Sequence, residues 1–166
     1  MKQYFPLTFF LFLLVSCDKN SDNNIRKEVL SIAENYVTGN LNDTTKIILD
    51  NGTIIIGDDQ KTYVIDPEKI FIGFIDQDKK EDAIISLLPY QGNIEVTTEH
   101  LFIINTSGQL ILIRALETDM RILDIKDGTI TAEIPEHTRN SPLFDCASCW
   151  EVVEYRFVNG ELVWVE

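Results

Sequence analysis

The chain has 166 residues, of which 45% are hydrophobic and 25% are charged, and 27 acidic residues outnumber 14 basic ones. This composition and length are typical of one ordinary globular domain. The formal net charge of −13 excludes nucleic acid and anionic lipid headgroups as expected partners, because like charges repel.

The N-terminal segment differs from the rest of the chain. Lys2 is followed by an apolar run from Tyr4 to Val15. The run is too short to span a bilayer, which takes about 20 apolar residues, and is typical of a secretory signal peptide. It ends in LVSC, and these four residues resemble the lipobox of bacterial lipoproteins. In that family the cysteine, here Cys17, is lipidated with acyl chains such as palmitate, and cleavage before it makes it the N-terminus.

This resemblance implies a signal peptide over 1–16, lipidated Cys17 and a short polar tether over 17–24. Removal of Lys2 makes the remaining chain one unit more negative, so the membrane would be reached through the lipid and not through a basic patch. The implied location is the bacterial cell envelope, on the periplasmic side or at the cell surface.

The globular part, 25–166, is predicted to begin with a helix. Its apolar residues form one stripe at helical spacing, with Asn23 or Asn24 as N-cap and Gly39 as the terminating glycine. The stripe consists of Ile25, Val29, Ile32, Ala33, Tyr36 and Val37.

From Thr45 onward the pattern is strand after strand. Glycine-containing turns at Asn51-Gly52, Ser107-Gly108, Asp127-Gly128 and Asn159-Gly160 separate β-rich runs, and such dipeptides accept the positive φ of a type I′ turn. Runs that are apolar on both sides, such as 109–116, are expected to lie centrally or under the helix. We predict an α+β domain in which one N-terminal helix packs on a mainly antiparallel, multi-stranded sheet, a meander of β-hairpins.

The loop FIDQDKKEDAIIS, residues 74–86, places Asp76, Asp78 and Asp82 between two apolar runs. It resembles the calcium loop of FG-GAP or integrin-type repeats, in which three or more acids precede an apolar strand. Two lysines stand where that loop has its third acid and glycine, and calcium requires six to eight oxygen ligands. A polar hairpin tip and a calcium site are both compatible with this pattern.

Part of the chain also resembles a class of small bacterial envelope lipoproteins of unassigned function. The residues that carry the resemblance are Asp82-Ala83, ILDIKDGTITAEI (122–134) and YRFVNGELV (155–163). The resemblance covers about half of the chain and implies a fold and a location, without an activity.

A second loop, 135–150, is the longest stretch without a strand pattern, and long irregular connections are often functional. It contains His137, Arg139, Asp145 and Trp150 as candidate binding residues. Its cysteines, Cys146 and Cys149, can form a disulfide outside the reducing cytosol, a redox pair, a zinc site with His137 and Asp145, or remain reduced.

No catalytic motif is present in the sequence. There are only two histidines, and His100 fits the end of a strand better than a catalytic base. The sequence therefore favours a non-catalytic binding module with a protein or glycan partner, without a required cofactor beyond possible calcium or zinc, and leaves open an enzyme that uses the 135–149 loop. The alternative is a periplasmic immunity or inhibitor lipoprotein that neutralises a toxin or hydrolase, because strong acidity suits a basic partner.

Overall fold

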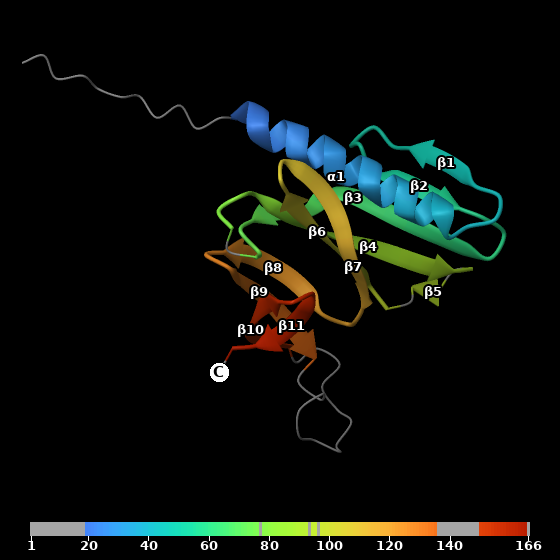
Figure 1. Cartoon of the computed structure of the whole chain (residues 1–166). Helices are drawn as coiled ribbons and strands as arrows, with labels where there is room; N and C mark the ends of the chain where they lie inside the picture. Colours follow the sequence, from blue (N-terminus) through green and yellow to red (C-terminus); the bar gives the residue numbers. More distant parts are fainter. Residues whose placement is uncertain (1–18, 77, 93, 96, 136–149, 166) are drawn as a thin grey trace, which may run out of the picture.

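The computed structural model describes residues 19–76, 78–92, 94–95, 97–135 and 150–165. The described chain is α+β, as predicted, with one helix and eleven strands (Figure 1). These elements are α1 (Lys19–Gly39), β1 (Thr45–Ile48), β2 (Ile54–Gly57), β3 (Lys61–Gly73), β4 (Asp82–Gln91), β5 (Ile94–Glu95), β6 (Glu99–Thr106), β7 (Gln109–Glu117), β8 (Arg121–Lys126), β9 (Thr129–Pro135), β10 (Trp150–Val158) and β11 (Glu161–Trp164).

The strands form two antiparallel sheets, where the sequence predicted one. Sheet A has the order β1-β2-β3-β4-β6-β7, with β5 paired to β4, and sheet B has the order β11-β10-β9-β8. The chain passes from sheet A to sheet B between the consecutive strands β7 and β8. Between them lies Met120, whose side chain is buried. Hairpin signals alone do not reveal such a change of sheet, because each hairpin looks the same in either arrangement.

Two buried apolar clusters lie on opposite faces of sheet A. Along β4, Ala83 and Ile85 belong to the first cluster, whereas Ile84 between them belongs to the second. Successive side chains of a strand point to opposite faces, so neighbouring residues of β4 fall alternately into the first and the second cluster. The first cluster also contains residues of α1, and the second contains residues of β8, β9 and β10. Figure 1 accordingly shows α1 on one side of sheet A and sheet B on the other.

The helix begins at Lys19, earlier than the apolar stripe predicted, so part of the expected tether is helical. Asp22 in the first turn interacts favourably with the helix dipole. Val29, Ala33 and Val37 are fully buried in the first cluster. Among the described residues, no helix combines the length and apolar character needed to cross a bilayer.

Three of the four glycine turns have the predicted geometry. In each, both central residues have positive φ, as at Asn159 (52°) and Gly160 (83°), which is the signature of a type I′ turn. The turn between β1 and β2 differs, because only Gly52 has positive φ there. Leu49 donates its N–H to Thr53 and accepts from Gly52, both at 2.9 Å. This is a three-residue loop that ends in a left-handed glycine, the next most common hairpin connection.

Strand β3 joins two runs that Pro67 was expected to separate. The pairing with β4 shifts in register between Ile65 and Ile70, which accommodates a proline that cannot donate a ladder hydrogen bond. The Arg26 guanidinium donates to the carbonyl oxygens of Pro67 and Ile70, each at 3.2 Å. At the end of β3, a Cβ on Gly73 would lie 2.7 Å from the carbonyl oxygen of Ile125, so glycine allows β3 and β8 to approach closely.

Candidate functional site

An acidic groove of about 420 Å³ lies beside the edge strand β1. We define it by its ten lining residues, which come from the α1–β1 connection, β1, β2, the β2–β3 turn and β3. They are Asn42, Asp43, Thr45, Ile47, Ile55, Gly57, Asp58, Asp59, Gln60 and Thr62.

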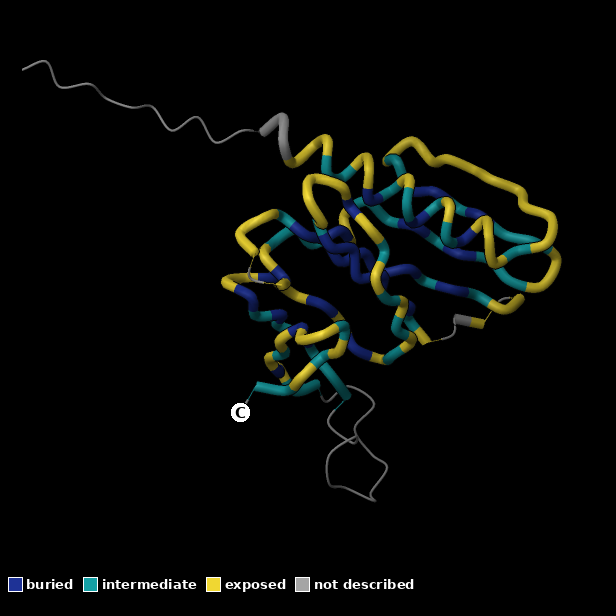
Figure 2. The backbone as a smooth tube through the Cα atoms, in the orientation of Figure 1, coloured by how far each residue is buried: buried dark blue, intermediate teal, exposed yellow. Residues whose placement is uncertain are grey.

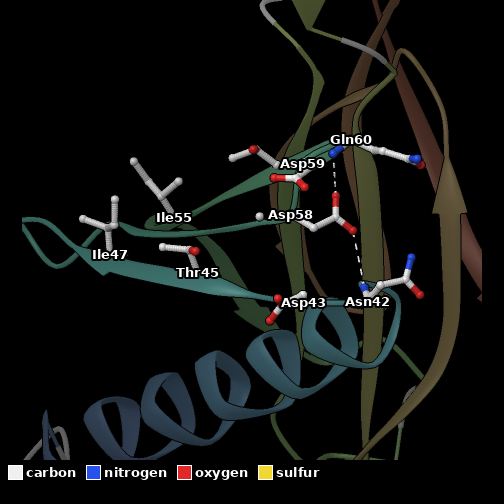
Figure 3. Close-up of a pocket in the computed structure, with 10 residues that line it drawn as sticks. Asn42, Asp43, Thr45, Ile47, Ile55, Asp58, Asp59 and Gln60 are labelled. Carbon is white, nitrogen blue, oxygen red and sulfur yellow. Dashed lines mark hydrogen bonds between the residues drawn. The ribbon is translucent and has the colours of Figure 1, made fainter.

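The groove is on the face of β1 and β2 that points away from α1. Ile54 and Ile56 point toward the helix and lie in the first buried cluster, so Ile55 and its register partner Ile47 occupy the opposite face. Figure 3 shows Ile47 and Ile55 side by side, with Asp43, Asp58 and Asp59 beyond them. Sheet B covers a different part of this face of sheet A (Figure 1).

The three carboxylates of the groove have different surroundings. Asp58 Oδ1 accepts the N–H groups of Gln60 and Lys61, both at 2.8 Å, and Oδ2 accepts that of Asn42 at 3.4 Å. The N–H groups of Lys61 and Gln60 hold the pKa of Asp58 below its ordinary value. Asp43 and Asp59 are exposed, and neither carboxylate has a hydrogen-bond or ion-pair partner among the described residues.

The lining of the groove favours a cationic ligand. None of its ten residues is cationic and three are acidic, so their fields add to a negative potential in the groove. Its apolar side chains are few, whereas small-molecule pockets are lined mostly by apolar and aromatic groups. The groove is therefore better suited to a segment of a basic protein than to an apolar small molecule.

The carboxylates of the loop that resembles a calcium site accept hydrogen bonds from nearby backbone N–H groups. Asp82 is fully buried; its carboxylate accepts the N–H groups of Ile75 at 2.7 Å, Asp76 at 3.3 Å and Asn105 at 2.8 Å. Burial raises the pKa of Asp82, and these three N–H groups oppose that rise. Three of the roughly four lone-pair sites of the Asp82 carboxylate are thus used by backbone N–H groups.

Asp76 and Asp78 likewise close local turns. Asp76 accepts the N–H of Asp78 at 3.1 Å, and Asp78 accepts that of Lys80 at 2.8 Å and also pairs with the Lys80 ammonium at 3.2 Å. In the part of the chain that the structure describes, no group of three or more acidic, histidine or cysteine side chains is placed to hold a metal ion. Asp76, Asp78 and Asp82 therefore do not present a common set of oxygen ligands for calcium.

A serine–histidine pair lies in the second cluster, away from solvent. Ser86 Oγ and His100 Nδ1 are 2.9 Å apart, and His100 Nε2 is 2.9 Å from the carbonyl oxygen of Met120. A carbonyl only accepts, so Nε2 carries the proton and Nδ1 accepts the serine hydroxyl. Burial lowers the pKa of His100 to about 4. Both side chains are buried, so the pair joins β4, β6 and the β7–β8 connection and offers no accessible nucleophile.

A second buried polar group lies on the helix side of sheet A. The Tyr36 hydroxyl of α1 donates to Glu99 Oε1 at 2.5 Å, while Glu99 Oε2 is buried without a hydrogen-bond partner among the described atoms. Burial, followed by the neighbouring Glu99 carboxyl, raises the pKa values of both Tyr36 and Tyr63. Tyr36, Tyr63 and Glu99 connect α1 to β3 and β6, and the two tyrosines stay protonated.

Of the candidate residues in the second loop, only Trp150 is described. Its ring is half-buried on sheet B, and the Arg121 guanidinium carbon lies 3.7 Å from the ring centroid. The cation–π contact occupies one face of the indole. His137, Arg139, Asp145, Cys146 and Cys149 lie outside the described residues, as does Cys17.

Comparison of the chain with protein-family models, with curated proteins and with solved structures finds no match. The acidic groove was not predicted from the sequence. The Asn42-Asp43 and Asp58-Asp59 pairs are visible as polar turn residues, but their meeting depends on the β1–β2–β3 meander folding back. No local pattern encodes that juxtaposition.

Proposed function

We propose that this protein is a lipoprotein of the bacterial cell envelope that binds a cationic partner protein through the acidic groove, without catalysis. The observation that carries the binding role is the groove itself, which combines three carboxylates with two isoleucines and no cationic residue. The lipobox-like end of the N-terminal segment supports the lipid anchor on Cys17, and the polar start of α1 places a charged helix directly after it.

A protein partner is favoured over a glycan. Sugar rings are commonly held by stacking on exposed aromatic side chains, and none of the groove residues is aromatic. A cationic protein would gain electrostatic steering from the net charge of −13 and from the groove, which speeds association at low ionic strength.

The second candidate function is a periplasmic immunity or inhibitor lipoprotein. The same acidic groove favours it, because basic toxins and hydrolases are complementary to such a surface. The two functions differ in outcome: an immunity protein protects cells from one toxin when it is expressed, and a general interaction module does not.

The anchor is tested by labelling cells with an alkyne-bearing palmitate and analysing the N-terminal peptide by mass spectrometry. We expect label on Cys17 and none after Cys17→Ser. Recovery of an unlabelled chain that still begins at Met1, in the cytosolic fraction, would remove the envelope assignment. In a non-reducing digest, a bridged Cys146–Cys149 peptide would establish the disulfide. Metal analysis of the intact purified protein tests the zinc alternative, and the absence of bound zinc would argue against it.

Groove binding is tested by calorimetry with a short peptide of alternating lysine and valine as the cationic probe. We expect Asp43→Asn combined with Asp59→Asn to weaken binding at least about tenfold, which is about 1.4 kcal/mol. Asp127→Asn combined with Glu154→Gln removes the same charge from sheet B and serves as the matched control. Equal weakening by the two double variants would mean that net charge, and not the groove, attracts the peptide.

A further inference from the structure

Strand β1 is an open edge of sheet A. Among the strands that the structure describes it pairs with β2 alone, and all four of its residues are exposed. Exposed residues continue along β1 in Figure 2, in contrast to the buried residues of the central strands. Ile47, Ile48 and Leu49 form three successive apolar residues with exposed fractions of 51%, 64% and 44%.

The register identifies which backbone groups face outward. Leu49 donates its N–H to the carbonyl of Thr53, so this pair is hydrogen-bonded. Bonded and non-bonded pairs alternate along antiparallel strands, and the next bonded pair is therefore Ile47 with Ile55. Lys46 and Ile48 belong to the non-bonded pairs, and their N–H and C=O groups point away from β2 toward the open edge.

The usual protections of an edge strand are weak at β1. Natural edges are blocked by proline, bulges or free charged side chains. The single lysine of β1, Lys46, is engaged with Glu34 of α1, and β1 contains neither a proline nor a register shift. At the opposite edge, β7 has a register shift against β6, and its Arg114 donates to the carbonyl oxygen of Gly160 at 2.7 Å.

We infer that β1 is the docking strand for the partner, and that an extended segment of a cationic protein pairs with Lys46 and Ile48 as an added strand of sheet A. This inference rests on the proposed function and specifies how the groove is used. Main-chain pairing would supply affinity, and alternate side chains of the added strand would supply specificity.

The two faces of β1 define the chemistry of the added strand. Directly opposed side chains in a sheet are about 5 Å apart, so one face of the added strand lies next to Thr45 and Ile47 and reaches Asp43. Lysine or arginine fits there, with the aliphatic stem on Ile47 and the charge at the groove acids. The other face lies next to exposed Ile48 and fits an apolar residue.

Charge decides against a second copy of this chain as the occupant. Each copy has a net charge of −13, so pairing two β1 strands would bring two strongly acidic bodies together. Like charges placed across an interface disfavour association. A cationic segment of a different protein has the complementary charge.

The test uses the alternating lysine–valine peptide and its analogue N-methylated at every residue, which keeps charge and side chains but has no N–H group left on either edge to pair as a strand. We expect the unmodified peptide to slow amide exchange at Lys46 and Ile48 and to bind at least about tenfold more tightly than the analogue. Ile48→Pro, which removes only an outward N–H, should weaken binding about tenfold. Ile48→Thr keeps the N–H and should weaken it less than about threefold.

The outcomes separate this inference from the proposed function. Equal binding of both peptides, still lost with the Asp43 and Asp59 variants, would overturn strand addition and leave the groove as the binding site. No binding of either peptide at low salt would overturn both. Concentration-dependent protection of Lys46 and Ile48 without peptide would identify a second copy as the occupant and overturn the choice of a cationic partner. Circular dichroism and thermal melting establish that Ile48→Pro folds.

Discussion

The centre of sheet A and its β1 edge are built from similar apolar residues but have different surroundings. Phe102 and Ile103 on β6 are fully buried, one on each face of the sheet. On β1, Ile47 and Ile48 are more than half exposed. The difference shows that β-rich apolar runs have two kinds of surroundings in this chain: the central ones fill the core between α1 and sheet B, whereas the run at β1 is exposed.

The largest effect is expected for Phe102→Ala at the centre. Phe102 is fully buried and stacks on Phe157, with ring centroids 5.1 Å apart. Removal of a buried phenylalanine ring leaves a cavity and costs about 3–5 kcal/mol of unfolding free energy. Urea denaturation followed by circular dichroism measures this loss. Ile48→Ala at the edge should change the free energy by less than about 0.5 kcal/mol, and similar losses for both variants would remove the contrast.

The next largest effect is the pH dependence of the unfolding free energy that His100 causes. Its pKa is about 4 in the folded protein against 6.5 ordinarily, so the unfolded chain binds the proton first as the pH falls. The stability contributed by neutral His100 is therefore complete above pH 6.5 and is lost progressively down to about pH 4. The loss is about 1.4 kcal/mol per pH unit and about 3 kcal/mol in total.

Unfolding free energies measured from pH 7.5 to pH 4 test this dependence. His100→Gln should be less stable at neutral pH, because its buried hydrogen bonds are altered, but should lack the histidine part of the slope. An unchanged slope in His100→Gln would assign the dependence to other groups.

A smaller loss is expected for Asp82→Asn, at the loop that joins β3 and β4. One carboxylate oxygen accepts from Ile75 and Asp76 and the other from Asn105. An asparagine must direct its NH₂ group at one of these donors, which costs about 1–3 kcal/mol for the group left unpaired. Chemical denaturation with and without calcium checks both roles of the loop. A variant as stable as the parent, with a calcium-dependent melting temperature in the parent alone, would favour a metal role.

The local features of the fold could be predicted from the sequence. The apolar stripe identified the helix, and glycine dipeptides identified the hairpins, because both signals depend on neighbouring residues. The assembly of the strands could not be predicted in the same way. The run 109–116 was expected to lie centrally or under the helix. It forms the edge strand β7, whose Leu110 packs in the first cluster with residues of α1, whereas Ile111 and Ile113 are exposed. Apolar character on both sides of a strand does not distinguish a central position from an edge.

The candidate sites show the same limit. The acids of 76–82 were predicted as a possible site because they are close in sequence, whereas in the structure they accept hydrogen bonds from nearby N–H groups. The groove acids come from two segments, at Asp43 and at Asp58-Asp59, that only the meander brings together. Residues 136–149 of the second loop and Cys17 lie outside the described residues, so the disulfide, zinc and lipidation hypotheses stay predictions.

The smallest effect on stability is expected at the edge, for Asp43→Asn combined with Asp59→Asn. Both side chains are exposed, and removal of two like charges relieves repulsion that salt already screens. We expect a change in unfolding free energy below about 0.5 kcal/mol, with a slight gain at low ionic strength. Urea denaturation at two salt concentrations measures it.

Asp58→Ala in the same groove provides the matched contrast. Asp58 accepts N–H groups of Gln60 and Lys61 at the β2–β3 turn, so its removal leaves those donors to water and loosens the turn. It should destabilise the fold more than the Asp43 and Asp59 pair, while weakening the cationic peptide less. The reverse ranking would mean that Asp43 and Asp59 support the fold and that Asp58 is the binding carboxylate. The groove acids near the β1 edge would then contribute to the stability of the fold, as the centre of sheet A does.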